Sequence, residues 1–472
     1  MTSLLYKDMK RAVAGLIAVL ASGAMLVLAL PPSNVWILGW FALVPVFWAT
    51  RETRLSVGVV AGIAATMFAA FLSTNGYLYR SGSAEGNSTW TYVGLALFGF
   101  VFAIVAGIAA EVKRPSLKSI LVVACAGVLV DCCLLAVIPA SLAISQSTVR
   151  PMLVLASFTG VWGIGFLIWF FNLAVSEVIA KNRTLIPGIA SIPVIFTLMF
   201  TINLTHSKTV PRLLVGVVQS DSNELAKMRE LSIEAVERQS ARLGRPFVVW
   251  PEFGGLYFTS RGETKKLTKL ASDPLMPAFV TTYQDGFKPL PHNTATLFSS
   301  SGESKSYFKR KLFGAESTMH TPGTKPVAVA WGDSLIGLNI CFDSCYPSII
   351  RDTARLGADI IALPTIDPES PYSFFAANHA AFTAIRAAEN GVSIVRADGN
   401  AYSAIVDSDG EVIGATNDGK DQVAYGLVSR YGRPTFYRWA GDWFPFACGG
   451  VLIWALLTNI RSKRAAKESA SK

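Results

Sequence analysis

The sequence predicts an integral membrane protein in which several membrane-spanning helices accompany one large water-facing α/β domain. Of the 472 residues, 51% are hydrophobic and only 16% are charged, and the mean hydropathy is +0.42. Soluble domains usually carry about 25% charged residues, so apolar runs long enough to cross a bilayer are expected. The apolar residues concentrate in 11–204 and 442–460, whereas residues 205–440 have the pattern of a soluble domain.

Eight apolar runs are candidate membrane spans, because a helix needs about 20 mostly apolar residues to cross a bilayer. They are residues 11–30, 35–50, 55–75, 90–111, 118–138, 152–179, 186–204 and 442–460. The first run is too long for a cleaved signal peptide, and another apolar run follows it at once. The predicted domains are therefore seven spans in 1–204, a soluble domain in 205–440, and a final span with a basic tail in 441–472.

The lysine and arginine residues predict the orientation, since cytoplasmic loops carry an excess of both. With the N-terminus inside, fifteen of them fall in the inside segments 7–11, 51–54, 113–118, 181–183 and 461–472. The short outside loops carry two, Arg80 and Arg150. We therefore expect cytoplasmic termini and an extracytoplasmic soluble domain. The net charge of +10 does not indicate a nucleic-acid partner, because many of the basic residues flank apolar runs.

The soluble region alternates between strand-like and helix-like segments. Short apolar runs predict strands at 213–219, 247–250, 278–283, 294–299, 305–312, 327–330, 335–340, 359–363, 392–397 and 402–407. Helical spacing predicts helices at 222–243, 347–356 and 373–390. Such alternation is typical of an α/β domain whose sheets are covered by helices.

Glu252 is a candidate general base. It follows Trp250 and Pro251 at the end of an apolar strand, where partial loss of solvent raises the pKa of a carboxyl group. A helix N-cap or an ordinary surface acid is the alternative reading.

Lys309 is a candidate oxyanion donor. In a strand it shares one face with Tyr307 and Lys311. Its ammonium group could stabilise a developing oxyanion, or it could be a solvated charge on an edge strand.

Cys341 is a candidate nucleophile, because it ends an apolar strand and a helix signal begins near Pro347. Backbone N–H groups and a helix N-terminus at such a turn would lower the pKa of the thiol. A disulfide with Cys345 is the alternative, although a spacing of four residues across a tight turn makes its geometry awkward. None of the four histidines pair at metal-ligand spacing, so no zinc site is predicted.

Three short segments resemble a known set of motifs. They are Trp250-Pro251-Glu252, Tyr307-Phe308-Lys309 and Asn339-Ile340-Cys341-Phe342-Asp343. In order and spacing they resemble the Glu, Lys and Cys motifs of the nitrilase (carbon–nitrogen hydrolase) superfamily. A domain of this kind between the last two of eight spans is similar to the apolipoprotein N-acyltransferase family. Further matching segments are Pro31-Pro32, Gly39-Trp40, Gly160-Val161-Trp162-Gly163 with Asn172, and His292-Asn293-Thr294-Ala295.

The resemblance implies an αββα sandwich and a ping-pong acyl transfer without cofactor or metal. Cys341 would attack an acyl ester of a phospholipid and form a thioester. Glu252 would be the general base, and Lys309 would stabilise the oxyanion. The acceptor would be the α-amine of the diacylglyceryl-modified N-terminal cysteine of an apolipoprotein. The resemblance also implies a bacterial inner membrane, with the catalytic domain facing the periplasm.

The sequence departs from the family pattern near the expected site. The loop after Lys309 is two residues short, which displaces its acid, Glu316, by one position. Asp343 stands where the family usually has Glu, and Asp367 lies in a segment that replaces the family's Asn-Asp-Trp. We interpret Glu316, Asp343 and Trp250 as possible supporting residues.

These departures leave three hypotheses open. The first is N-acylation of lipoproteins. The second is a diverged membrane nitrilase, an acyltransferase or amidase with another acceptor. The third is a non-catalytic scaffold that binds lipoproteins, for which a Cys341–Cys345 disulfide would be evidence.

Overall fold

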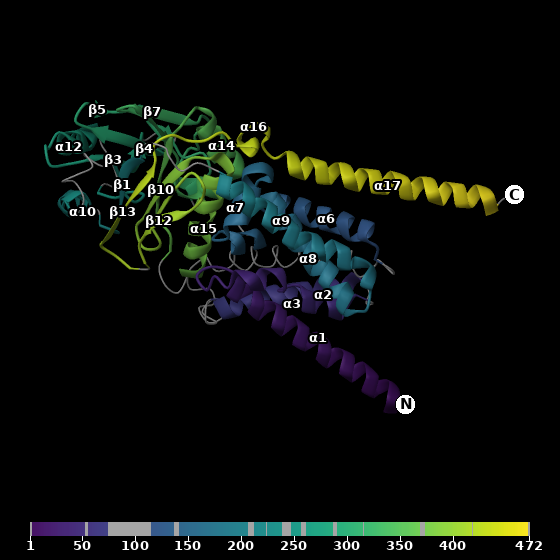
Figure 1. Cartoon of the computed structure of the whole chain (residues 1–472). Coiled ribbons are helices and arrows are strands. Elements are labelled where there is room, and N and C mark those ends of the chain that lie inside the picture. Colours follow the sequence, from purple (N-terminus) through teal and green to yellow (C-terminus); the bar gives the residue numbers. More distant parts are fainter. Residues whose placement is uncertain are drawn as a thin grey trace. The chain divides into compact units, whose positions relative to one another are not determined.

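The computed structural model divides the chain into two units, which are described separately. It describes residues 2–51, 55–73, 115–135, 141–205, 212–222, 224–237, 247–255, 261–286, 290–314, 316–368, 373–417 and 419–470. One unit is helical and comprises Met1–Gln146, Thr159–Met199 and Asp442–Lys472. The other comprises Ser147–Phe158 and Phe200–Gly441 and contains all the described strands (Figure 1).

Apolar helices make up the helical unit. They are α1 (Thr2–Ala29), η1 (Trp36–Trp40), α2 (Val44–Thr50), α3 (Leu55–Ser73), α6 (Leu117–Leu135), η2 (Leu142–Gln146), α8 (Val161–Ile179), η3 (Arg183–Leu185), α9 (Ile186–Thr205) and α17 (Trp443–Ala470). Three stretches among the described residues are long and apolar enough to cross a membrane: Met9–Ala29, Val161–Ile179 and Arg183–Ile202. The total of eight spans stays a prediction.

Two of the predicted spans differ in the structure. The run 152–179 is wrong as a single helix, because α7 (Arg150–Thr159) is separated from α8 by Gly160, whose φ of 68° interrupts the helix. The run 35–50 is divided between η1 and α2. The predicted span 90–111 lies outside the described residues.

Buried amide side chains join the helices of this unit. Asn172 of α8 accepts a hydrogen bond from the backbone N–H of Leu43 at 2.9 Å and donates to the carbonyl of Gly39 at 3.1 Å. Trp40 donates through its indole nitrogen to Gln146 at 3.0 Å. Polar groups in apolar surroundings need such partners, so these contacts fix η1 against α8 and η2.

The α/β unit contains one seven-stranded sheet and one six-stranded sheet. One sheet has the order β13-β1-β2-β3-β4-β5, with β6 also paired to β4. Its strands are β1 (Arg212–Gln219), β2 (Phe247–Val249), β3 (Ala278–Asp285), β4 (His292–Ser299), β5 (Gly302–Glu303), β6 (Tyr307–Phe308) and β13 (Gln422–Ser429). The other has the order β12-β11-β10-β9-β8-β7. Its strands are β7 (Val327–Trp331), β8 (Ser334–Leu338), β9 (Ile360–Thr365), β10 (Ser393–Asp398), β11 (Ala404–Val406) and β12 (Val412–Ala415).

Helices cover the outer face of each sheet, which gives the four layers of an αββα sandwich (Figure 1). α10 (Leu225–Glu237) packs on β1, and α12 (Arg261–Ala271) packs near β4. α14 (Pro347–Arg355) packs on β8, and α15 (Ser373–Asn390) packs on β10. The two sheets touch through pairs such as β1 with β10 and β3 with β9. The nitrilase-like α/β sandwich that the sequence predicted is thus confirmed.

Parallel pairing places the functional loops. β1, β2 and β3 are parallel neighbours in one sheet, and β8, β9 and β10 are parallel neighbours in the other. The carboxyl ends of parallel strands meet at the same edge of a sheet, and ligands bind outside such edges in open α/β folds. Glu252 follows β2, and Cys341 and Asp367 follow β8 and β9.

The predicted strand 305–312 is too long, because only Tyr307–Phe308 pairs with β4 as β6. β12, β13 and α12 were not predicted from the sequence. β12 has an exposed or half-buried pattern, and α12 is rich in lysine, so neither carries the apolar signal that identified the other elements.

Candidate active site

The three predicted catalytic residues come from the ends of three different strands. Glu252 lies in the turn after β2, Lys309 directly follows β6, and Cys341 is the first residue of η4 (Cys341–Cys345) after β8. All three side chains are buried. The Glu and Lys side chains come from one sheet and the Cys from the other, so packing the two sheets assembles the group.

Lys309 lies between two carboxylates. Its ammonium nitrogen donates to Glu252 Oε1 at 2.9 Å and to Glu316 at 2.8 Å. The Lys309 side chain is 2% exposed and that of Glu252 is 1% exposed. Burial lowers the pKa of Lys309, but the negative charges of the two carboxylates outweigh it and hold the pKa above its usual range. The lysine is therefore a fixed cation.

Glu252 has one oxygen occupied and one available. Oε1 accepts from Lys309 and from Asn293 Nδ2, the latter at 2.6 Å. Oε2 is buried and has no hydrogen-bond partner among the described residues. Burial raises the pKa of Glu252 against the opposing charge of Lys309. The predicted rise is confirmed, and a carboxylate with a free oxygen and a raised pKa is suited to accept a proton.

Cys341 is held in a strained and enclosed position. Its φ of 46° lies in the left-handed region, which costs a non-glycine residue on the order of 1–3 kcal/mol. Burial raises the pKa of the thiol well above its usual range, and the charge of Glu252 raises it further, while Lys309 opposes both. The predicted lowering is wrong, because enclosure among protein groups outweighs the N–H groups of the turn. The thiol is neutral at physiological pH and needs a base.

The disulfide alternative does not appear in the structure. Cys341 and Cys345 are both buried free thiols. The cysteine side chain is therefore available for nucleophilic chemistry.

Asp343 connects the lysine segment to the cysteine turn. It accepts from the Tyr307 hydroxyl at 2.6 Å, from the backbone N–H of Lys311 at 2.9 Å and from that of Ile340 at 3.0 Å. Burial raises its pKa to about 6. Tyr307 and Lys311 flank Lys309 in the sequence, and Ile340 precedes Cys341. The Asp343 carboxylate therefore fixes the lysine segment against the cysteine turn.

Of the other two predicted supporting residues, Glu316 lies in the site and Trp250 lies in the hydrophobic core. Glu316, at the start of α13 (Glu316–Met319), is the second carboxylate on Lys309. Trp250 lies in the hydrophobic core between its sheet and helices α10 and α12. Its ring stacks on Phe279 with centroids 4.2 Å apart, and its indole N–H donates to Ser232 Oγ at 2.8 Å. Its contacts are those of a core residue.

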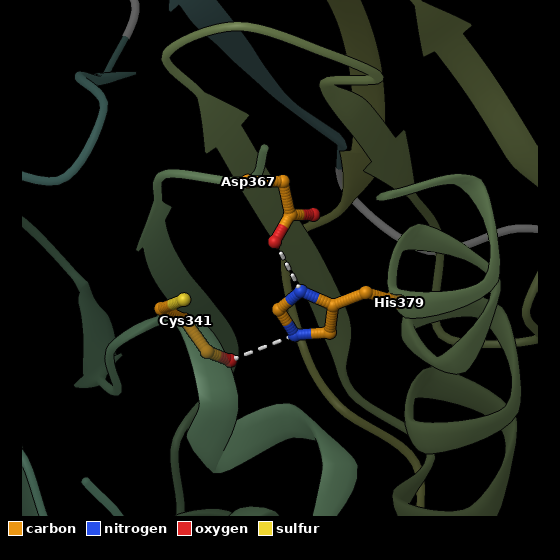
Figure 2. Close-up of side chains that lie close together, drawn as sticks. All are labelled: Cys341, Asp367 and His379. Atoms are coloured by element: carbon orange, nitrogen blue, oxygen red, sulfur yellow. Dashed lines mark hydrogen bonds and ion pairs between the residues drawn. The ribbon is translucent and has the colours of Figure 1, made fainter. Parts of the chain in front are cut away.

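Three further residues of the site, which the sequence did not predict, lie near Glu252 or Cys341. Asn293 of β4 donates to Glu252 at 2.6 Å and to Glu316 at 3.3 Å. Asp367, after β9, and His379, on α15, lie beside Cys341 (Figure 2). Asn293 and Asp367 had appeared only in segments compared with the family, and His379 only as an isolated histidine. Their proximity depends on the tertiary structure.

His379 and Asp367 form a buried ion pair. The Nδ1 atom of His379 is 2.8 Å from Asp367 Oδ1. Burial lowers the pKa of His379, but the negative charge of Asp367 outweighs it and raises the pKa to about 10. The pair therefore stabilises the fold while the histidine is protonated. This contribution is fully present below pH 6.5, the usual pKa of histidine, and is lost as the pH rises through about 10.

Replacing His379 by Gln should show this pH dependence. We expect the wild type to be more stable than His379→Gln at pH 6.5, by an amount on the order of a few kcal/mol. The difference should shrink towards pH 10. Thermal unfolding of the detergent-solubilised proteins at several pH values measures it. A difference that stays constant from pH 6.5 to pH 10 would show that His379 is not a charged partner of Asp367.

Comparisons with known proteins find a matching family for the N-terminal helical part and for the α/β part of the chain. The family model described as the apolipoprotein N-acyltransferase N-terminal domain matches residues 22–174, and the carbon–nitrogen hydrolase model matches residues 214–433. An apolipoprotein N-acyltransferase from Geobacter metallireducens is 26% identical over 371 residues, which cover 68% of this chain and 70% of that protein.

Two further similarities are more distant. Apolipoprotein N-acyltransferase 2 from Treponema denticola is 22% identical over 379 residues, covering 67% of this chain and 72% of that protein. The crystal structure of an amidase from Nesterenkonia sp. is 22% identical, covers 50% of this chain and 96% of its own, and has a TM-score of 0.39. Both family models match the chain, one after the other, and relatives of the same description match over 70% and 72% of their length, so the chain belongs to the apolipoprotein N-acyltransferase family of acyltransferase enzymes.

Proposed function

We propose that this enzyme transfers an acyl chain from a phospholipid to the α-amine of the diacylglyceryl-modified N-terminal cysteine of apolipoproteins, through a thioester on Cys341. Family membership supports N-acylation of lipoproteins in general. The observation that carries the thioester mechanism is the burial of Cys341 together with Glu252, whose Oε1 is held by Lys309 while its Oε2 has no partner among the described residues and can accept a proton.

In the first half-reaction, Glu252 Oε2 takes the proton from Cys341 Sγ as the sulfur attacks the carbonyl carbon of the acyl ester. The negative charge that develops on the carbonyl oxygen is stabilised by the ammonium group of Lys309. The ester C–O bond then breaks, and the departing lysophospholipid alcohol takes the proton from Glu252. A thioester remains on Cys341.

In the second half-reaction, the acceptor amine attacks the thioester carbonyl. Glu252 takes a proton from the amine nitrogen, and the C–S bond breaks as the amide forms. Glu252 then returns this proton to the sulfur of Cys341. One carboxylate can serve both steps because Lys309 and Asn293 hold its Oε1 in place.

The location that we propose follows from the chemistry of the substrates and from the apolar helices. Both substrates are lipid-anchored, so an enzyme in the same bilayer meets them by two-dimensional diffusion. The three span-length apolar stretches support a membrane protein. The distribution of lysine and arginine supports cytoplasmic termini and a catalytic domain on the periplasmic face of the inner membrane.

Intact-mass spectrometry after incubation with phospholipid tests the acyl-enzyme. We expect an added acyl mass that neutral hydroxylamine removes, since hydroxylamine cleaves thioesters. The adduct should be lost in Cys341→Ala and kept in Cys345→Ala, which removes the other buried thiol of η4. An adduct that survives in Cys341→Ala would exclude Cys341 as the nucleophile, and no adduct on a free Cys341 would favour a non-catalytic scaffold.

The two neighbouring lysines provide a matched comparison. Lys309→Ala should slow formation of the acyl-enzyme by about 100-fold or more, because it removes a preorganised oxyanion donor. Lys311→Ala should change the rate by less than about threefold, since the Lys311 ammonium lies 4.4 Å from the centre of the Tyr346 ring and not between carboxylates. Single-turnover kinetics with labelled phospholipid measure both rates. The reverse ranking would contradict the assigned role of Lys309.

A further inference from the structure

A buried ion-pair network of His379, Asp367 and Arg396 lies beside Cys341. His379 Nδ1 is 2.8 Å from Asp367 Oδ1, and its Nε2 is 3.2 Å from the backbone carbonyl oxygen of Cys341 (Figure 2). The proposed half-reactions use neither His379 nor Asp367. The two side chains therefore need an explanation of their own.

The hydrogen-bond partners define the charge of His379. A carboxylate oxygen and a backbone carbonyl oxygen can only accept hydrogen bonds. Nδ1 faces Asp367, and Nε2 lies 3.2 Å from the carbonyl oxygen of Cys341 and 3.0 Å from Ser344 Oγ. The Ser344 hydroxyl donates its one proton to the Cys341 carbonyl at 2.9 Å, so its oxygen accepts from Nε2. Both ring nitrogens therefore carry a proton, and the ring is an imidazolium. The raised pKa of His379, to about 10, agrees with this assignment.

Two further side chains, Arg396 and Asn400, donate hydrogen bonds to Asp367. Its Oδ2 accepts a hydrogen bond from the guanidinium of Arg396, which also donates to Asp398 at 2.7 Å. The side-chain amide of Asn400 donates to the backbone carbonyl of Asp367 at 2.9 Å. Cys341, Asp367 and His379 are grouped closely enough to suggest a cation site. However, the imidazolium and the guanidinium already occupy both carboxylate oxygens, which makes the group a closed ion-pair network.

The network acts on the backbone of the nucleophile. The carbonyl oxygen of Cys341 accepts from His379 and also from Ser344 Oγ at 2.9 Å. This carbonyl belongs to the residue whose φ of 46° is strained. In a planar trans peptide the C=O and the following N–H point in opposite directions. Holding the Cys341 carbonyl therefore also fixes the direction of the Phe342 N–H.

We propose that His379, braced by Asp367, is a positioning residue for the nucleophile: by holding the Cys341 carbonyl it aims the Phe342 N–H at the carbonyl oxygen of the acyl group, as a second oxyanion donor beside Lys309. This inference rests on the proposed acylation of Cys341. It assigns His379 to stabilisation of the oxyanion and not to activation of the thiol, whose proton goes to Glu252.

Comparing two reactions of the same thiol tests this assignment. Acylation by a 4-nitrophenyl ester passes through an oxyanion and releases 4-nitrophenolate, which is followed as a burst. Alkylation by iodoacetamide displaces iodide from carbon and forms no oxyanion. His379→Ala should slow acylation of Cys341 by about 100-fold, the usual effect of losing one oxyanion donor, while alkylation at pH 8.5 stays within about threefold of the wild type.

His379→Gln should recover part of the acylation rate, because its amide can still donate to the Cys341 carbonyl. Asp367→Asn should show the same loss of acylation as His379→Ala, with alkylation unchanged or faster because the charge of Asp367 raises the pKa of the Cys341 thiol. It keeps the volume of the side chain, so it tests the network if the alanine variant does not fold. Asp273→Asn is the matched control, since Asp273, after α12, forms a partly exposed ion pair with Arg229 of α10 at 2.7 Å and has no hydrogen bond to the network among the described residues. It should leave both reactions unchanged.

Either of two results would overturn the proposal. Unchanged acylation in His379→Ala and Asp367→Asn would show that the network does not serve the oxyanion. Equal losses of acylation and alkylation would show that it acts on the thiol or on folding instead. The activated ester does not depend on the natural donor, so a wild type that reacts with the ester but not with phospholipid would count against the proposed donor alone.

Discussion

The site depends on the burial of one ammonium group between two carboxylates. Removing Lys309 and Glu252 from water costs several kcal/mol per ion, and a buried pair is retained only where further hydrogen bonds satisfy its remaining atoms. Glu316 and Asn293 supply those bonds. Because the cluster needs all of its members, it fixes the turn after β2, the segment after β6 and the start of α13 in one arrangement.

Burial is the main reason why the proposed nucleophile is a neutral thiol. Burial raises the pKa of Cys341, the charge of Glu252 raises it further, and the charge of Lys309 opposes both. A thiolate stored at rest would be exposed to oxidation and to stray electrophiles. A thiol that loses its proton only when Glu252 accepts it couples ionisation to attack on the acyl group. Glu252 allows this coupling because Lys309 holds its Oε1 in place while its Oε2 is free to accept the proton.

The sequence predicted the layers of the fold well, because strands such as 213–219 are short apolar runs and helices such as 373–390 show helical spacing. It also predicted Glu252, Lys309 and Cys341 as the catalytic residues, because they occupy predicted strands or their ends in recognisable short segments. The direction of the Cys341 pKa could not be predicted, since it depends on how far the second sheet encloses the thiol. Asn293, Asp367 and His379 are separated by up to 86 residues, and nothing in their local sequence links them to the nucleophile.

The pH dependence of Cys341 alkylation tests the central claim of a buried neutral thiol most directly. The rate for iodoacetamide, localised to Cys341 by peptide mapping, would be measured from pH 5 to pH 10. We predict a rate that keeps rising through pH 9 without a plateau, because the pKa of the thiol lies above its usual range. A plateau reached below pH 7 would reveal a thiolate at rest and would contradict the role of Glu252 as the base that ionises it.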